Sequence, residues 1–231
     1  MGKKQEITNT PVTATDLRRQ MIMAWEAITK WWGPWQASLT EEIWRYEPPL
    51  KQQVALLMSQ WGAEQGGGTT YNFNLTGVKH PGPSKDPYKT DYFFAATFEV
   101  FDKATAQSYV QRGGSLVEVL EDTGATMKLR FKPDHPACAF RAFPTLREGC
   151  LFHLKNLSDN YKEAWAVVVQ FLDEHNLASL GAFVNKLAAK RYFTGSTEHY
   201  LANITRYYKE YVNAGDPVWK EAYQFAEARR T

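Results

Sequence analysis

The spacing of apolar residues changes from helical to β and back to helical along this chain, which limits the folds it can adopt. Residues 15–32 and 50–65 repeat apolar side chains every three or four positions, as in helices buried on one face. Residues 80–135 are the least helical part: TFEVFD and SLVEVLEDTGATMKLRFK alternate or cluster β-branched and aromatic residues. Within them LVEVLEDTGATMKLRF predicts a hairpin that turns near residues 122–125. Helical spacing returns from about Leu146. The sequence therefore predicts an α+β domain with a mainly helical lobe, a small β-hairpin lobe and a cleft between them.

Local signals predict where several of these elements begin and end. Thr15 or Asp16 is expected to cap the first helix, and Gly33 with Pro34 to end it. Residues 66–79 and 81–94 are rich in turn-forming residues and are expected to be loops. The other predicted boundaries are Pro48-Pro49 before the second helix, Gly113-Gly114 after a short helix, Ser196 with Glu198, and Asp216-Pro217. Four or five helices are expected after Leu146.

Composition and charge exclude few classes of protein. The net charge of +2 is small and does not favour nucleic acid binding, for which a clustered basic face would be expected. No apolar run of about 18 residues is present, so no membrane span is expected. The start MGKKQEITNTPVTATD lacks an apolar segment after its basic residues, so we expect no cleavable signal peptide. The five histidines show no metal-ligand spacing, and no metal or cofactor is expected.

The two cysteines, Cys138 and Cys150, leave two alternatives open. In an oxidising compartment they can form a disulfide that closes a short loop. Otherwise they are two buried thiols.

One acidic residue interrupts the apolar face of the second helix. The face is formed by Leu50, Val54, Leu57, Met58 and Trp61. Glu64 follows Trp61 by three positions, so the spacing predicts a carboxylate on a buried face, where such a group is usually paired or functional. Burial and the negative end of the helix dipole both disfavour its charged form and raise its pKa. A general acid near neutral pH requires this property.

Three consecutive glycines, Gly66, Gly67 and Gly68, follow Glu64. One glycine is enough to cap the helix. The other two give backbone freedom and leave room for a large ligand beside the carboxyl group.

Three motifs in this order resemble the glucosaminidase-type peptidoglycan hydrolases, family 73 of the glycoside hydrolases. SQWGAEQGGG at 59–68 with YNFNLTGVK at 71–79 is similar to the family's glutamate motif. FRAFPT at 140–145 and RYFTG at 191–195, followed by Tyr200, are similar to its later motifs. The chain departs from the family at Gln65, where Ser or Thr is usual, at Phe143, where Tyr is usual, and in a long stretch between Lys79 and Phe140.

The resemblance implies a lysozyme-like helical lobe and cleavage of β-1,4 bonds between N-acetylglucosamine and N-acetylmuramic acid. It assigns Glu64 as the catalytic acid and Tyr192 as a residue that orients the acetamido group. Glu121 fits a second carboxylate best, with Asp122, Glu118 and Glu99 as rivals. The residues assigned to substrate binding are Gly66, Gly67, Gly68, Tyr71, Asn72 and Tyr200.

The resemblance also suggests one catalytic domain over residues 1–231. Its parts are an N-terminal helical region (1–49), a catalytic helix and loop (50–79), a β lobe (80–140) and a C-terminal helical part (141–231).

The biological setting expected from the resemblance is that of a type VI secretion effector, secreted without a cleavable signal and active in a target bacterium's periplasm. Its expected partners are peptidoglycan strands and a periplasmic immunity protein that plugs the cleft. A phage-encoded lysin or virion wall hydrolase, a muramidase, and a catalytically dead glycan-binding module are the alternatives.

Overall fold

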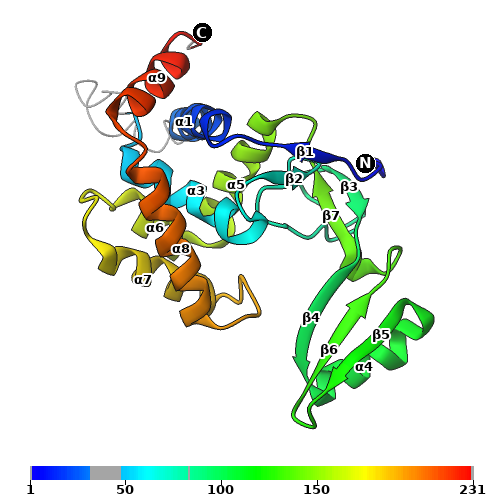
Figure 1. Ribbon diagram of the computed structural model, residues 1–231. Helices are drawn as coiled ribbons and strands as arrows, with labels where there is room; N and C mark the ends of the chain where they lie inside the picture. Colours follow the sequence, from blue (N-terminus) through cyan, green and yellow to red (C-terminus); the bar gives the residue numbers. More distant parts are fainter. Residues whose placement is uncertain (1, 32–47, 83, 230–231) are drawn as a thin grey trace, which may run out of the picture. The chain divides into compact units, whose positions relative to one another are not determined.

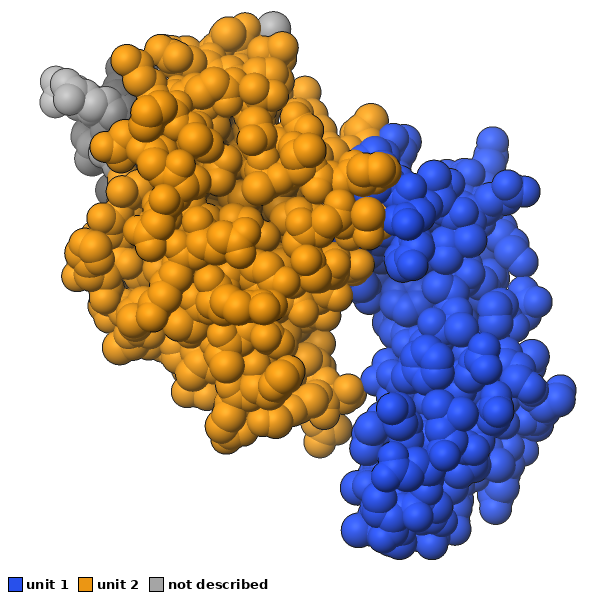
Figure 2. Space-filling view, viewed as in Figure 1, with its two compact units in different colours: residues 1–10, 71–144 blue, residues 11–70, 145–231 orange. Residues whose placement is uncertain are grey.

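The computed structural model describes residues 2–31, 48–82 and 84–229, which form a mixed α+β fold (Figure 1). The chain divides into two compact units, coloured separately in Figure 2. Unit 1 comprises Met1–Thr10 and Tyr71–Pro144, and unit 2 comprises Pro11–Thr70 and Thr145–Thr231. Strands β1 (Asn9–Pro11) and β2 (Thr69–Tyr71) pair with each other, and the chain passes between the units within them. None of the described helices is long and apolar enough to span a bilayer.

Unit 2 is helical. Its helices are α1 (Ala14–Trp31), α3 (Lys51–Gln65), α5 (Leu146–Asn160), α6 (Lys162–Val169), α7 (Leu177–Ala189), α8 (Thr197–Val212) and α9 (Asp216–Glu227). Helix α3 packs against α8, α1 and α6, and α1 also packs against α5 and α9. The prediction of four or five helices after Leu146 is confirmed, with five.

Helix α3 differs from the predicted helix with one apolar face. Every residue from Gln52 to Gly62 is buried, because helices cover α3 on several sides. The helix still begins after Pro48-Pro49 and ends at Gln65, as predicted. It is therefore the central helix of the unit, and the last turn carries its first solvent-exposed position, Glu64.

Helix α1 begins one residue earlier than predicted, and its cap is not Thr15 or Asp16. The hydroxyl oxygen of Thr13 accepts a hydrogen bond from the Asp16 backbone N–H at 3.0 Å, so Thr13 caps the helix. The predicted end at Gly33 and Pro34 lies outside the described residues. By contrast, Ser196 caps α8 by accepting from the His199 N–H at 3.2 Å, and α9 starts at Asp216 as predicted.

Gly62 lets α3 and α8 approach closely. A β-carbon at this position would lie 2.4 Å from Cγ of Tyr207, which no side chain tolerates without movement. The Tyr207 ring has little freedom to move, because it is buried and stacks on Tyr211 at 6.0 Å between ring centroids. Gly181 in α7 offers a contrast, since a β-carbon there would meet no atom within 4 Å in the part of the chain that the structure describes.

We therefore expect Gly62→Ala to lower the free energy of unfolding by about 1–3 kcal/mol, through overpacking. Gly181→Ala is the matched control and is expected to raise it by about 0.5–1 kcal/mol, because alanine favours the helix. Chemical denaturation of the two variants and the wild type measures both changes. Equal effects of the two substitutions would contradict the close helix approach at Gly62.

His153 in α5 is a buried histidine with a strongly lowered pKa. The residue is 2% exposed, and neither ring nitrogen has a partner at hydrogen-bonding geometry among the described residues. Burial lowers its pKa to about 4, and a weaker interaction with the Leu57 backbone opposes this. The folded state therefore resists protonation at a pH where the unfolded chain accepts a proton.

Stability is consequently expected to fall as the pH drops from the ordinary histidine value toward 4. Between about pH 7.5 and about pH 5, His153 should account for roughly 2 kcal/mol of lost unfolding free energy. His153→Leu removes the titrating group and is expected to lose less stability over this interval. Denaturation of both proteins at the two pH values tests this, and an identical pH dependence would contradict it.

Unit 1 contains the β structure. Its regular elements are β3 (Asp91–Phe94), β4 (Thr97–Asp102), α4 (Lys103–Gly113), β5 (Val117–Asp122), β6 (Thr126–Phe131) and β7 (Ala139–Ala142), with short 3₁₀ turns at Gly114–Leu116 and Pro136–Cys138. Strands β5 and β6 form the predicted hairpin, and α4 ends at the predicted glycines. Strand β4 completes a three-stranded antiparallel sheet in the order β4-β6-β5.

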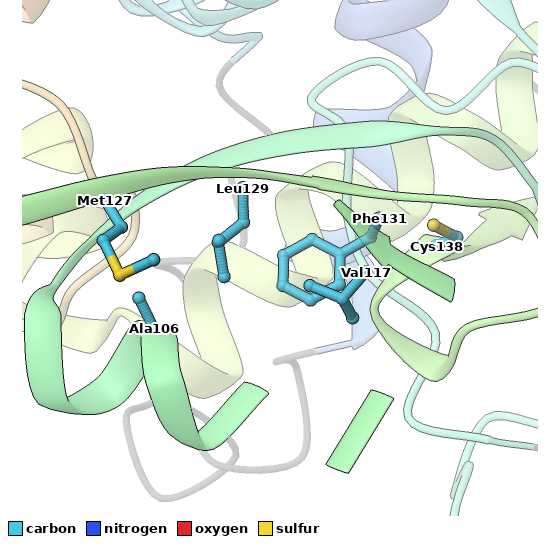
Figure 3. Packing of buried hydrophobic residues seen from close by; sticks show 6 residues of the cluster. All are labelled: Ala106, Val117, Met127, Leu129, Phe131 and Cys138. Carbon is cyan, nitrogen blue, oxygen red and sulfur yellow. The ribbon is translucent and has the colours of Figure 1, made fainter. Parts of the chain in front are cut away.

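A small core lies between this sheet and α4. The alternating pattern of β6 sends Met127, Leu129 and Phe131 to the inner side, while Lys128 and Arg130 face outward. Figure 3 shows these three side chains in a row with Ala106 of α4 and Val117 of β5 beside them. The core therefore follows the two-residue period of the sequence.

Strand β3 corrects the prediction of a loop over residues 81–94, and β2 corrects the loop predicted at 66–79. β3 pairs with β7, with Phe93 opposite Phe140. On its other edge the N-terminal segment runs parallel to it, through hydrogen bonds from Gln5 N to the Tyr92 oxygen and from Tyr92 N to the Lys3 oxygen. Both strands are short, and their pairing depends on residues far apart in sequence.

A buried polar network joins the 80–90 segment to β7. The Asp86 carboxylate accepts hydrogen bonds from Arg141 Nη1 at 2.7 Å, from the Thr90 N–H at 2.7 Å and from the Thr90 hydroxyl at 2.8 Å. His80 lies beside it, with Nε2 3.4 Å from Asp86 Oδ2. Burial alone would raise the pKa of Asp86, but the hydrogen bonds from Arg141 and Thr90 outweigh it and lower the pKa. The carboxylate thus stays charged inside the unit.

Candidate active site

The candidate site lies in unit 2, at the end of α3. Glu64 is exposed rather than on a buried face, which corrects the interpretation of the helical spacing. The buried part of α3 ends at Gly62, and the next residue, Ala63, is only half-buried, so Glu64 lies beyond the covered part of the helix. Protein atoms nevertheless surround the Glu64 carboxyl group closely enough for desolvation to raise its pKa to about 7. The Glu64 carboxyl group is thus accessible to solvent and still partly protonated at neutral pH.

The Tyr200 hydroxyl is the polar group that acts on this carboxyl group. It lowers the pKa of Glu64, against the larger effect of desolvation. Tyr200 belongs to α8, which packs against α3, and its side chain is buried. The ring of Tyr200 stacks on Phe193 with centroids 4.1 Å apart, which fixes its direction. Burial, Tyr192 and Glu64 all raise the pKa of Tyr200 well above its usual value. The Tyr200 hydroxyl therefore keeps its proton and can donate a hydrogen bond.

The glycines after Glu64 have different reasons to be glycine. Gly66 caps α3 in the left-handed conformation at φ 70°, and its N–H donates to the Gly62 oxygen at 3.0 Å. Gly67 also has a positive φ of 77°, and a β-carbon there would approach the Tyr211 hydroxyl to 3.3 Å. Gly68 has neither constraint, since its φ is not positive and a β-carbon there would meet no atom of the described residues within 4 Å. The fold thus explains why Gly66 and Gly67 are glycines, but it gives no such reason for Gly68.

Tyr192 joins the Glu64 site through Tyr200. It lies after α7, and it raises the pKa of Tyr200. Its ring meets that of Tyr161 edge to face, with centroids 5.0 Å apart. Three of the proposed site residues, Glu64, Tyr192 and Tyr200, are thus brought together within unit 2.

The predicted substrate-binding residues Tyr71 and Asn72 belong to unit 1, as does Glu121. Tyr71 is exposed. The side chain of Asn72 is committed to the N-terminal segment: its oxygen accepts from the Thr8 N–H at 2.9 Å and its amide donates to the Glu6 oxygen at 2.9 Å. Its positive φ of 48° suits an asparagine in a turn. The structure therefore gives Asn72 a structural task.

The candidates for a second carboxylate differ in their ion pairs. Asp122 lies 3.2 Å from Lys103, Glu118 lies 3.7 Å from Arg130, and Glu99 lies 3.8 Å from Lys79. Glu121 is exposed on β5 and forms no ion pair with any described residue. It is thus the candidate among the four whose carboxylate is least engaged.

Both cysteines are free and buried, so the structure contains the two thiols and not the disulfide. Cys138 lies in unit 1 and donates a hydrogen bond to the Lys132 oxygen at 3.0 Å, while Cys150 lies in unit 2. Burial raises the pKa of both thiols, which makes them poor nucleophiles. Over the described ranges, no three side chains of the metal-binding types gather into a metal site.

Sequence reasoning missed three residues that shape these surroundings. Gly62 allows α8 to approach α3. Asn74 bonds the Val78 N–H and the Val78 and Arg141 oxygens, and so shapes the turn after β2. Gln60 is completely buried one turn before Glu64. Only Gln60 had a signal in the sequence, namely its spacing of four from Glu64.

Comparison with protein families, with characterised proteins and with solved structures gives no match. Inferences about function therefore rest on the residues and their geometry.

Proposed function

We propose that this protein is a glycoside hydrolase that cleaves β-1,4 bonds between N-acetylglucosamine and N-acetylmuramic acid in peptidoglycan, of the endo-β-N-acetylglucosaminidase type. The observation that carries the proposal is Glu64, a solvent-accessible carboxyl group whose pKa desolvation raises to about 7. A general acid needs such a group, protonated at neutral pH and open to substrate. The unoccupied side-chain space at Gly68 supports a bulky ligand nearby.

In the proposed reaction Glu64 donates its proton to the glycosidic oxygen as the bond from that oxygen to the anomeric carbon breaks. Positive charge develops on the sugar ring, and water then adds to the anomeric carbon. Glu121, the unpaired candidate, would stabilise this charge or activate the water. Where the substrate's own acetamido group takes that part, Tyr192 would orient it.

The fold proposed with this activity is a lysozyme-like helical lobe and a β-hairpin lobe with a substrate cleft. The proposed setting is an antibacterial effector, delivered without a cleavable signal into a target cell's periplasm and neutralised in the producer by an immunity protein. A phage lysin would show the same chemistry. Expression in a Gram-negative host with and without an added export signal tests the setting, and toxicity confined to the exported form is expected.

Digestion of purified sacculi by the wild-type protein tests the activity. Released muropeptides are reduced with borohydride and their reduced sugar is identified. Reduced glucosamine is the expected product. Reduced muramic acid would instead indicate a muramidase, and binding to sacculi without soluble products would indicate an inactive glycan-binding module.

A further inference from the structure

A buried glutamine lies next to the proposed acid. The Gln60 side chain is fully buried in α3, and neither its Oε1 nor its Nε2 has a partner at hydrogen-bonding geometry among the described residues. Buried amides are nearly always satisfied, so such a side chain needs an explanation. Tyr200 has the same property, since its buried hydroxyl also lacks a partner at that geometry.

These two unsatisfied groups and Glu64 lie close together. Gln60 precedes Glu64 by four residues on α3, so the two side chains leave the same face of the helix. Tyr200 comes from α8, the helix packed on α3, and interacts with both side chains. Contacts of this kind are often long in a free enzyme and shorten when substrate binds.

The effect of each side chain on its neighbour's pKa indicates which group donates the hydrogen bond. Gln60 lowers the pKa of Tyr200, as an amide N–H that donates to the phenol oxygen does. Tyr200 in turn lowers the pKa of Glu64, as a hydroxyl that donates to the carboxylate does. The hydroxyl has a single proton, so these two directions are compatible.

We propose that Gln60 is a positioning residue: its amide Nε2 donates to the Tyr200 hydroxyl oxygen and so directs the hydroxyl proton onto the Glu64 carboxyl group. The inference rests on the proposed function, in which Glu64 is the acid. Gln60 and Tyr200 together would limit the rise in the Glu64 pKa that desolvation causes. They would also hold its carboxyl group in one orientation.

Few other titratable groups enter this arrangement. Among the described residues, Tyr200 is the titratable side chain that acts on Glu64, and Tyr192 is the further one that acts on Tyr200. Helices α1 and α6 also pack on α3, but the side chains described for them supply no titratable group to Glu64.

The test compares Gln60→Met, Tyr200→Phe and the double variant with the wild type. Each single variant should move the alkaline limit of sacculus digestion upward by about 0.5–1 pH unit, because Glu64 loses a hydrogen-bond donor. The double variant should show no further shift, since both residues act through one hydroxyl. Tyr200→Phe keeps the ring and its stacking, so the test survives a Gln60→Met protein that does not fold.

Gln53→Met is the matched control. Gln53 is a buried glutamine of the same helix, but its amide donates to the Val169 oxygen at 2.8 Å and accepts from the Leu50 N–H at 2.8 Å. Its replacement should lower stability and leave the alkaline limit unchanged. Equal shifts in the Gln53 and Gln60 variants, or additive shifts in the double variant, would overturn the proposal.

A carboxyl ¹³C NMR titration separates this inference from the proposed function. The Glu64 signal is assigned by its absence in Glu64→Gln and followed against pH in the same variants, without any substrate. A raised Glu64 pKa in both single variants supports the positioning role even where no sacculi are digested. An unchanged pKa in an active protein would overturn the role and leave the hydrolase proposal standing.

Discussion

A Glu64→Gln variant is expected to release muropeptides from sacculi at least about 100-fold more slowly than the wild type, because glutamine cannot donate the proton that the leaving oxygen needs. The amide keeps the size and shape of the carboxyl group, so the protein should still bind sacculi. Muropeptide release over time, together with a pull-down on insoluble sacculi, measures the two properties separately.

The same assignment predicts how wild-type activity depends on pH. Glu64 acts while it is protonated, and desolvation raises its pKa to about 7. Activity should therefore decline as the pH rises through about 7, and Glu64→Gln should remove this decline from whatever activity remains. A wild-type rate that is flat between about pH 6 and about pH 8 would count against Glu64 as the acid.

Loss of folding is not expected to explain the loss of activity. A carboxyl group whose folded-state pKa is raised destabilises the fold as the pH rises above its ordinary value, since the folded state resists ionisation. Glu64→Gln removes this effect, so the variant should melt at the same temperature as the wild type or higher at neutral pH.

The matched control is Glu227→Gln, which replaces an exposed glutamate in α9 of the same unit and should be fully active. Wild-type activity in Glu64→Gln would remove this residue from the chemistry.

Elements with local signals were predictable from the sequence. The hairpin of β5 and β6 and the end of α4 at its glycines follow from alternation and turn residues within one segment. Strands β3 and β7 were missed because each is four residues long and gains stability from a partner distant in sequence. Short strands of this kind carry too few residues for alternation to show.

The candidate site was predictable only in part, for a related reason. The spacing in α3 singled out Glu64, but it predicted a buried face, because a sequence does not show where the covered part of a helix ends; here it ends at Gly62. The effect of Tyr200 on the Glu64 pKa depends on the packing of α8 against α3, which Gly62 permits. The motif pattern assigned Asn72 to substrate binding, and the tertiary fold adds hydrogen bonds between its side chain and the N-terminal segment that the sequence does not show.

Arg141→Met is expected to lower the free energy of unfolding by about 3–5 kcal/mol, because it leaves the buried Asp86 carboxylate without its cation. The two side chains are 6% and 1% exposed, and their nitrogen and oxygen lie 2.7 Å apart. Asp86 has a lowered pKa, so the stability it provides is present above the ordinary aspartate pKa and is lost as the pH falls through the lower folded value. Denaturation of wild type and variant near neutral pH measures the loss.

A second ion pair with the same distance but exposed side chains tests whether burial causes the large stability loss expected for Arg141→Met. Lys186 and Glu163 also lie 2.7 Å apart, but their side chains are 47% and 60% exposed. Lys186→Met should therefore cost no more than about 1 kcal/mol, since water solvates the remaining carboxylate. Similar losses in the two methionine variants would mean that Asp86 finds other compensation when Arg141 is removed. A large loss confined to Arg141→Met would instead make the arginine of the FRAFPT segment a residue that joins the 80–90 segment to β7.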